Sequence, residues 1–482
     1  MNRVNCSKKM LTGLAFTISC QLACAVSPGT GDMTPDSSFP TAFVDNPTSG
    51  GSFDHAVAIV PSDSGGYWLL GGSDADDGTH ATPVVAEYSS TGVAMPPAFF
   101  ASNTNLSSLL TIISAVKGVN NGVTRIYFVG EYVAPNFTDS DFGVVCMVPT
   151  SGFQACPGFG TNGHTSVAFD RGGSNNDFPT SVTYDASSGG LYIAGNVDIG
   201  GRTAVGVARI DGTTGARDSN WGNNSTTDGT FVYPVTFKTN GSSYAKAITV
   251  GSPRFFAEDV FVVGNAEASG NATDRDGFIL PIDAVDGANF DAGWNAGAPR
   301  RVYFDLGTTT KTDFLTAVTL RHNGQLLVAG LANGDSGLTH LILGEFDGEG
   351  VPKTNFCGGL GVCQGPLFNA PYPAAIAERP GEGDIVIAAT NTDSGGHGIQ
   401  GIYEIDSRGA SVLGYDETSW TSNTGTTPSS FTNGVLVDSA DRVIEVGSRL
   451  WDSSTVDYDM TIRRWTAKDT IFGNSFGGPF VD

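Results

Sequence analysis

A short apolar segment closed by a small residue recurs seven times along the chain. Its copies are YWLLG, IYFVG, LYIAG, VFVVG, LLVAG, IVIAA and VIEVG, which end at Gly71, Gly130, Gly195, Gly264, Gly330, Ala389 and Gly447. The intervals between these ends are 59, 65, 69, 66, 59 and 58 residues. Spacing this regular indicates a repeat architecture in which every copy adds the same supersecondary unit.

The segment from Asp313 to Gly350 shows the unit most clearly. Leu315 to Leu320 alternates apolar and polar residues, a turn follows, and Leu326 to Ala329 is a short apolar run. This pattern predicts two strands joined by a hairpin. Leu341 to Phe346 predicts a third strand, and runs such as Arg301 to Asp305 supply a fourth. One stretch, Leu106 to Val116, has a spacing that also suits a helix, but the repeat register places a strand there.

Seven units of four antiparallel strands predict an all-β protein, a seven-bladed β-propeller, with a β-solenoid as the alternative. The ring is preferred because the chain begins and ends on the same element, SFPTAFVD at Ser38 to Asp45 and SFGGPFVD at Ser475 to Asp482. One of these tails should pair with the blade at the opposite end of the chain, because an open sheet edge invites association. The N-terminal tail, Thr41 to Asp45, is the preferred one.

The N-terminus has the features of a secretory signal peptide. Arg3, Lys8 and Lys9 precede an apolar run, Leu11 to Ala25, that ends in Ala-Cys-Ala. We therefore expect residues 1–25 to be removed and residues 26–482 to form a single propeller domain of seven repeats in a secreted or periplasmic protein. Acylation of Cys24 is the alternative, although Gln21 stands where a lipoprotein signal normally carries leucine. No later apolar stretch is long enough to predict a membrane span.

Charge narrows the range of partners. Removing the leader takes away three of 25 basic residues and none of the 49 acidic ones, which lowers the formal net charge from −24 to −27. Binding to nucleic acid or anionic membranes depends on Lys and Arg neutralising phosphates, so neither is expected as a partner. We expect a monomer whose partner is an extracellular protein or a carbohydrate.

Four cysteines remain after the leader: Cys146, Cys156, Cys357 and Cys363. In an exported protein this even number favours disulfides, and of the three connectivities the one that joins sequence neighbours is preferred: Cys146 with Cys156, and Cys357 with Cys363. Their spacing does not match that of a zinc site.

Between the units lies a second landmark, an aromatic residue among Gly, Asp and Asn. The instances are Phe39, Phe159, Trp221, Trp294, Phe356, Trp420 and Phe476, with Phe99 and Phe100 between the first two units. We expect these aromatic residues to pack between sheets. Together with LLVAG and LYIAG, the tails DSNWGNN, TNFCGG and NSFGG resemble the delta-60 repeat family. The resemblance covers nearly all of residues 26–482 and implies a secreted bacterial propeller, but no agreed activity.

Paired aspartates occupy loops that follow the second strand of several units. They are Asp74 and Asp76, Asp139 and Asp141, Asp274 and Asp276, and Asp457 and Asp459. Carboxylates at alternate positions suit Ca²⁺, which prefers oxygen ligands, so calcium is the one cofactor that the sequence suggests. The alternative is structural, because Asp also stabilises turns by accepting hydrogen bonds from nearby amides.

No catalytic residue is assigned from the sequence. The six histidines show no HxH or HExxH spacing, and the Asp-Ser-Gly turns recur in several units rather than marking one nucleophile. The evenness of the repeats favours a secreted binding or scaffold module. The alternative is an extracellular propeller enzyme, a hydrolase or lyase on carbohydrate, with carboxylates gathered at the channel mouth.

Overall fold

The computed structural model describes most of the chain between residues 35 and 465. The described ranges are 35–39, 42–44, 53–74, 80–100, 109–133, 139–149, 152–223, 228–253, 258–269, 274–288, 290, 293–304, 306, 311–333, 339–368, 372–393, 395–410, 412–418, 429–452 and 457–465. The predicted signal peptide and the tail at Ser475 to Asp482 lie outside them.

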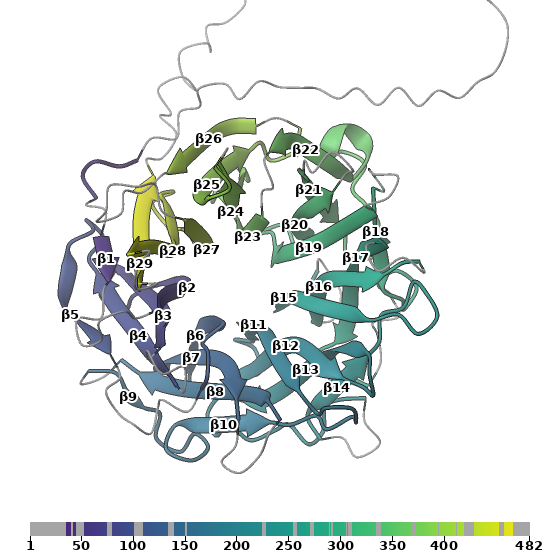
Figure 1. Ribbon diagram of the computed structural model, residues 1–482, viewed down its shortest axis with the longest axis horizontal. Helices are drawn as coiled ribbons and strands as arrows, with labels where there is room; N and C mark the ends of the chain where they lie inside the picture. The colour runs from purple at the N-terminus through teal and green to yellow at the C-terminus, as the bar shows by residue number, and fades with distance from the viewer. Residues whose placement is uncertain are drawn as a thin grey trace, which may run out of the picture.

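Sheets arranged around a central opening make up the fold (Figure 1). An eight-stranded sheet brings together the two ends of the chain: β1 (Ala42–Val44), β2 (Phe53–Pro61), β3 (Tyr67–Asp74), β4 (Ala81–Tyr88), β5 (Ala94–Phe100), β27 (Ser430–Val437), β28 (Val443–Asp452) and β29 (Asp457–Trp465). It consists of two antiparallel groups, β2 to β5 and β27 to β29 with β1, joined by one parallel bridge at Phe53 and Tyr458.

Two further sheets follow along the chain. The first contains β6 (Ser114–Asn120), β7 (Val123–Tyr132), β8 (Asp141–Val148), β9 (Gln154–Ala155) and β10 (His164–Val167). The second contains β11 (Asp177–Tyr184), β12 (Gly190–Asp198), β13 (Thr203–Asp211) and β14 (Thr230–Tyr233). The described part of Leu106 to Val116 contains no helix, and β6 begins within it, as the repeat register predicted.

A second eight-stranded sheet and a four-stranded sheet complete the arrangement. The larger contains β15 (Ser243–Gly251), β16 (Asp259–Glu267), β17 (Asp274–Asp283), β18 (Arg300–Val302), β19 (Lys311–Leu320), β20 (Leu326–Asn333), β21 (Thr339–Phe346) and β22 (Val362–Phe368). The smaller contains β23 (Tyr372–Glu378), β24 (Ile385–Thr392), β25 (Gly398–Ile405) and β26 (Val412–Thr418). Only a parallel contact between the starts of β17 and β19 joins the two halves of the larger sheet.

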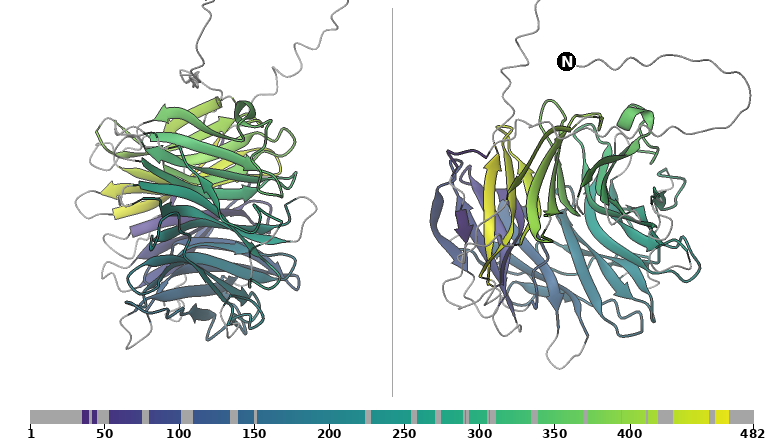
Figure 2. Two further views of the ribbon diagram at one scale, coloured as in Figure 1. Left: turned by 90° about the vertical axis from the view of Figure 1, so that its right-hand side faces the viewer. Right: turned by 45° about the horizontal axis from the view of Figure 1, so that its top comes forward.

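The described part of the chain is therefore all-β, and its one helical element is a 3-10 turn, η1 (Cys357–Gly359). No helix among the described residues is long and apolar enough to cross a membrane. In each group the first strand lies next to the central opening, and later strands lie farther out (Figures 1 and 2). Because β2 runs parallel to β29, and β19 to β17, these neighbouring groups begin on the same face of the ring.

The recurring glycine is explained by a close backbone approach. Opposite this glycine, the innermost strand has a register shift. At the shift, a backbone carbonyl oxygen of the innermost strand points toward the glycine Cα. A Cβ on Gly330 would lie 1.8 Å from the Phe314 oxygen, and one on Gly264 would lie 2.0 Å from the Tyr244 oxygen. Side chains are therefore excluded at these positions on steric grounds. In the sixth unit Ala389 takes this place and is fully buried.

The landmark aromatics pack between neighbouring groups, as predicted. Those whose burial is described, Phe39, Phe159, Trp221, Trp294 and Phe356, are all buried. Each lies against a glycine with positive φ in a turn of another part of the ring: Gly92, Gly215, Gly287, Gly350 and Gly409, respectively. A side chain at that glycine would occupy the space of the aromatic ring, so the ring can pack closely only against a glycine. Because the aromatic residue and the glycine belong to different groups, this packing joins neighbouring groups.

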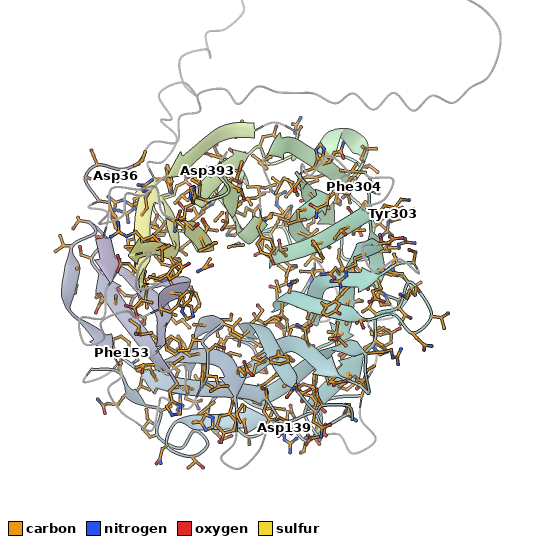
Figure 3. All side chains as sticks on the ribbon, in the orientation of Figure 1. Asp36, Asp139, Phe153, Tyr303, Phe304 and Asp393 are labelled. Carbon is orange, nitrogen blue, oxygen red and sulfur yellow. A yellow bond between two sulfur atoms is a disulfide. The ribbon has the colours of Figure 1, made fainter. Side chains whose placement is uncertain are left out.

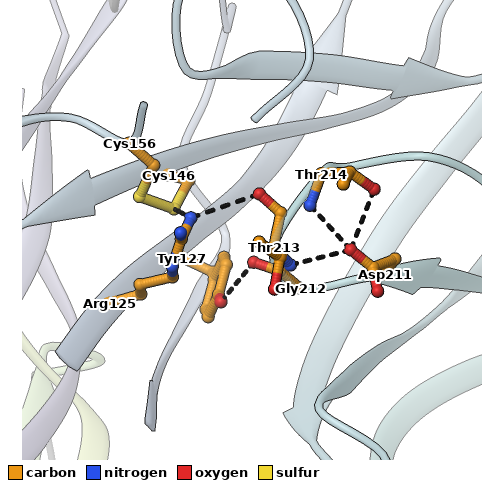
Figure 4. Close-up of a disulfide and its surroundings, with 8 residues drawn as sticks. All are labelled: Arg125, Tyr127, Cys146, Cys156, Asp211, Gly212, Thr213 and Thr214. Atoms are coloured by element: carbon orange, nitrogen blue, oxygen red, sulfur yellow. Dashed lines mark hydrogen bonds between the residues drawn. A yellow bond between two sulfur atoms is a disulfide. The ribbon is translucent and has the colours of Figure 1, made fainter. Parts of the chain in front are cut away.

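Polar contacts join the same neighbours. The Tyr127 hydroxyl donates to the Gly212 carbonyl oxygen at 2.7 Å, and Arg125 donates to the Thr213 oxygen at 3.3 Å (Figure 4). Asp211 accepts the amides of Thr213 and Thr214 and so fixes the turn that receives these bonds. Buried donors and acceptors are thereby satisfied across the boundary between two sheets.

Both predicted disulfides are present. Cys146 and Cys156 are joined with a Cα separation of 5.3 Å, and Cys357 and Cys363 with one of 5.4 Å. Both separations fall within the usual range for a disulfide. Two structural disulfides are compatible with an extracellular protein, because thiols stay reduced in most cytosols.

The N-terminal tail pairs with the last strand, as the preferred prediction stated. β1 is antiparallel to β29, with Ala42 opposite Ile462 and Val44 opposite Met460. Pro35 forms a further bridge to Trp465. Residues from the two ends of the described chain therefore share one sheet.

Candidate ligand-binding pocket

A polar pocket of about 510 Å³ lies between the group that contains β11 to β14 and the group that begins with β15. Its lining residues are Ser174, Asn176, Phe178, Asn196, Asp198, Gly201, Arg202, Thr203, Ser242 and Tyr244. The volume is within the usual range for small-molecule sites. The lining combines two aromatic rings with amides, hydroxyls and one guanidinium, so the pocket can contact both the apolar and the polar parts of a ligand.

The starts of innermost strands provide both aromatic rings. Phe178 lies near the start of β11 and Tyr244 near the start of β15, and each precedes the register shift of its strand. The corresponding residues of other innermost strands are His55, Phe314, Tyr372 and Phe431, and Thr111 takes this place just before β6. Phe178 is 41% exposed, Tyr372 44% and Phe431 39%, so this position repeatedly presents an aromatic ring to solvent.

Two asparagine side chains of the pocket accept hydrogen bonds from the protein through their oxygens, while their NH2 groups remain free to donate. Asn196 Oδ1 accepts the Ala245 amide at 2.9 Å, and Asn176 Oδ1 accepts the Ser140 amide at 3.1 Å. These bonds fix the orientation of both side chains, because only the oxygen can accept from an amide. Their Nδ2 groups and the Arg202 guanidinium have no hydrogen-bond acceptor among the described residues.

Asp198 is the one carboxylate that lines the pocket, and the protein already satisfies it. It accepts the Ser174 amide and hydroxyl, both at 2.7 Å, and the amides of Gly200 and Gly201 at 3.0 and 3.1 Å. The hydrogen bond from the Ser174 amide has the largest effect, and together these bonds lower the pKa of Asp198 to about 2. Asp198 therefore stays ionised at neutral pH and is not suited to act as a general acid.

Two of the aspartates predicted to bind calcium form ion pairs with arginine instead. Asp276 of β17 pairs with Arg301 of β18. Asp459 of β29 pairs with Arg449 of β28 at 2.9 Å. A carboxylate that is neutralised in this way is a poor calcium ligand, so these two residues support the structural interpretation.

The other predicted calcium residues lie at strand ends around the ring. Asp74 ends β3, Asp274 begins β17 and Asp457 begins β29, whereas Asp76 lies outside the described residues. Among the described residues, no three His, Cys, Asp or Glu side chains come together in a way that could hold a metal ion. Asp139 lies on the opposite side of the ring from Asp393, another turn aspartate (Figure 3). Calcium binding at the loops stays a prediction.

Asp141 and Asp177 belong to a separate acidic cluster near the start of β11. Desolvation by burial, with Asp170 and Asp139 nearby, raises the pKa of Asp141 to about 6. Desolvation also raises the pKa of Asp177 to about 7, with further repulsion from Asp141 and Asp170. Raised values of this kind occur in catalytic acids, but they also occur in buried structural groups.

The role of Asp177 repeats around the ring and is therefore structural. Its Oδ2 accepts the Phe169 amide at 2.9 Å. Asp313 accepts the Phe304 amide at 2.7 Å, and Ser243 Oγ accepts the Val235 amide at 3.1 Å. These three side chains are fully buried, and each directly precedes the aromatic residue near the start of an innermost strand. Each accepts a hydrogen bond from the segment that leads into that strand and so holds the segment in position.

The pocket residues were not identified from the sequence. They come from separate segments, 174–178, 196–203 and 242–244, and none belongs to a motif. One signal was present: an aromatic residue recurs near the start of the first strand of several units, at Phe178, Tyr244, Phe314, Tyr372 and Phe431. Its recurrence at one register position indicates a shared location in the ring.

Comparison with known proteins shows only remote structural likeness. No family model and no curated protein matches the chain, so the delta-60 resemblance stays a prediction. The structure is similar to an ulvan lyase from a new family of polysaccharide lyases, with 10% identity, 89% of this chain and 96% of that chain covered, and a TM-score of 0.48. It is also similar to an α-L-arabinofuranosidase from Fusarium graminearum, with 9% identity, 73% and 92% covered, and a TM-score of 0.41.

A protein of unknown function from Dyadobacter fermentans is similar at 8% identity, with 90% of this chain and 99% of that chain covered and a TM-score of 0.44. At these identities and TM-scores, the likenesses carry no argument about what this chain binds or does.

Proposed function

We propose that the chain is an exported seven-bladed β-propeller that binds a carbohydrate in the pocket of Phe178 and Tyr244. Each eight-stranded sheet corresponds to two blades, because single short parallel bridges join its halves. With this division, β1 completes the blade of β27 to β29, and every blade has four main strands. The two disulfides fit an oxidising compartment, which supports export.

The observation that carries the binding role is the composition of the pocket. Phe178 offers an exposed ring face, and polar donors stand beside it with no acceptor of their own among the described residues. Sugars have apolar faces that stack on aromatic rings and hydroxyl oxygens that accept hydrogen bonds. A pocket with both features fits a sugar better than it fits an apolar ligand.

A binding role is favoured over hydrolysis for a chemical reason. Glycosidases commonly use two carboxylates on either side of the scissile bond, one of them with a raised pKa. This pocket has one carboxylate, Asp198, whose pKa is lowered. The aspartates with raised pKa, Asp141 and Asp177, do not line it.

Affinity electrophoresis in gels that contain soluble polysaccharides tests the proposal. We expect the purified protein to be retarded by at least one member of a panel of neutral and anionic polysaccharides, and Phe178→Ala to abolish that retardation. The same polysaccharide should show no new reducing ends after incubation. If no panel member retards the protein, carbohydrate binding is wrong; if reducing ends accumulate, the protein is an enzyme.

A further inference from the structure

The free groups of the pocket are hydrogen-bond donors. The side-chain oxygens of Asn196 and Asn176 each accept a hydrogen bond from a backbone amide, so their Nδ2 groups are available to donate to a ligand. Ser242 Oγ accepts the Thr203 amide at 3.3 Å, so its hydroxyl hydrogen is also available. Asp198 receives its donors from residues 174, 200 and 201. A ligand group that accepts hydrogen bonds therefore fits these free donors.

Positive charge gathers around these donors, although the chain as a whole is acidic. Arg202 lines the pocket, and the Arg275 guanidinium stacks on the Tyr244 ring at 4.8 Å from its centroid. Lys246 follows Tyr244 by two residues on β15. Within the described part of the chain, none of these three cations forms an ion pair with a carboxylate.

Lys246 shows the local field most clearly. Desolvation by burial lowers the pKa of its ammonium group, and repulsion from Arg275 lowers it further. A neighbouring anion would relieve both effects, because it would replace lost hydration and neutralise the repulsion. Glu267, opposite Arg275 on β16, already attracts that guanidinium. Of the three cations, Arg202 is the one that lines the pocket.

From these observations we propose that the pocket recognises an anionic sugar, with a uronic carboxylate or a sulfate ester held by Arg202 and the Nδ2 groups of Asn176 and Asn196. The sugar ring lies against Phe178. This inference rests on the proposed carbohydrate binding and specifies its ligand class. Guanidinium pairs with planar or tetrahedral anions through two parallel hydrogen bonds, which gives both affinity and orientation.

Within the pocket the one negative charge is Asp198, whose oxygens are hydrogen-bonded to Ser174, Gly200 and Gly201. The negative charge of the rest of the chain acts from farther away. Charges beyond a Debye length of about 8 Å at physiological ionic strength are largely screened, whereas Arg202 contacts the ligand directly. The acidic surface does oppose long, densely charged polymers. Short oligosaccharides are therefore the appropriate probes.

The test uses two pairs of probes in isothermal titration calorimetry. One pair is an oligogalacturonate of about four sugars and its methyl ester; the other is a sulfated galactan oligosaccharide and its desulfated form. We expect the charged member of at least one pair to bind roughly tenfold or more tightly than its neutral counterpart. The pair that shows the preference distinguishes carboxylate from sulfate.

Three variants assign the preference to the pocket. Arg202→Gln should remove it, and so should N196D, which keeps the oxygen that accepts the Ala245 amide and replaces the donor with a negative oxygen. R217Q is the matched control, because Arg217 follows the far end of β13 and carries the same charge change away from the pocket. Melting curves confirm that each variant is folded.

Each outcome decides between the two proposals. A charge preference that is lost in R202Q and kept in R217Q supports the anionic-sugar assignment. Equal binding of charged and neutral members, abolished by Phe178→Ala, overturns the assignment and leaves carbohydrate binding standing. Absence of binding by both pairs also overturns it, and the polysaccharide panel then decides whether the pocket binds neutral sugars or none.

Discussion

The guanidinium of Arg464 on β29 forms an ion pair with Asp36 at 2.7 Å, across 428 residues of sequence. The same guanidinium donates to the Ser90 carbonyl oxygen and lies over the Phe39 ring. Arg464 is thus the point at which the last strand, the N-terminal segment and the first sheet group meet. Its contacts support the closure that the pairing of β1 with β29 establishes.

The N-terminal clasp, which consists of residues 35–39 and β1, should stabilise the fold. Phe39 is 3% exposed and packs against Tyr67 in the core. Phe39→Ala should lower the free energy of unfolding by about 3–5 kcal/mol, the usual cost of truncating a buried phenylalanine. Urea unfolding measures this, with Tyr303→Ala, a 53% exposed ring away from the two chain ends, as a control of smaller effect. Equal effects from the two variants would show that the clasp does not stabilise the ring.

The pairing of the N-terminal tail with the last group could be predicted from the sequence. The segments at Ser38 to Asp45 and Ser475 to Asp482 are alike, and an open sheet edge is unfavourable. The glycine period likewise predicts which residues face one another, since five of the glycines lie opposite a register shift of the innermost strand: Gly71, Gly195, Gly264, Gly330 and Gly447. The pocket could not be predicted in this way. Asn196, Arg202 and Tyr244 become neighbours only when two groups pack side by side, and no local pattern records that contact.

Gly330 should not tolerate a methyl group, although the sixth unit accommodates Ala389 at the corresponding position. In Gly330→Ala the new Cβ would lie 1.8 Å from the Phe314 carbonyl oxygen, so the backbone must move. We expect a loss of about 3 kcal/mol in the free energy of unfolding, the upper part of the usual range for overpacking. Gly344→Ala is the matched control, because its new Cβ would meet only side-chain atoms at 3.1 Å or more. A loss no larger for Gly330→Ala than for Gly344→Ala would refute the steric explanation.

Stability should fall as pH rises through the range in which Asp177 titrates. Its pKa of about 7 in the folded protein exceeds its ordinary value of 3.8, so between these values the folded state binds more protons than the unfolded chain. The free energy of unfolding should therefore decrease with pH by up to about 1.4 kcal/mol per unit over this window and level off above it. Below pH 4 the contribution is fully present.

Asp177→Asn isolates this effect, because the amide is neutral and its oxygen can still accept the Phe169 amide. Relative to the parent protein, the variant should gain stability at pH 8 and gain little at pH 4. Thermal unfolding at the two pH values measures the difference. The same pH dependence in both proteins would mean that folding does not raise the pKa of Asp177.

The purified exported protein should contain no free thiol under denaturing conditions, because all four cysteines outside the leader are paired. Reduction should destabilise it, since a disulfide that closes a loop of about ten residues contributes roughly 2–3 kcal/mol in the chain-entropy model. Thiol titration followed by melting with and without reductant tests both points. Four titratable thiols before reduction would contradict the pairing.

The ligand is expected in one pocket, and not at every innermost strand that carries an aromatic residue near its start. Phe178 and Phe431 occupy the same place in their innermost strands and are 41% and 39% exposed, but only Phe178 lines the polar pocket. Calorimetric titration with the oligosaccharide that binds best should compare the parent protein with Phe178→Ala and Phe431→Ala. We predict that Phe178→Ala weakens binding about fivefold or more, in keeping with a stacking contribution of about 1 kcal/mol, and that Phe431→Ala leaves the dissociation constant unchanged. Equal weakening by both variants, or by neither, would contradict the assignment of the pocket.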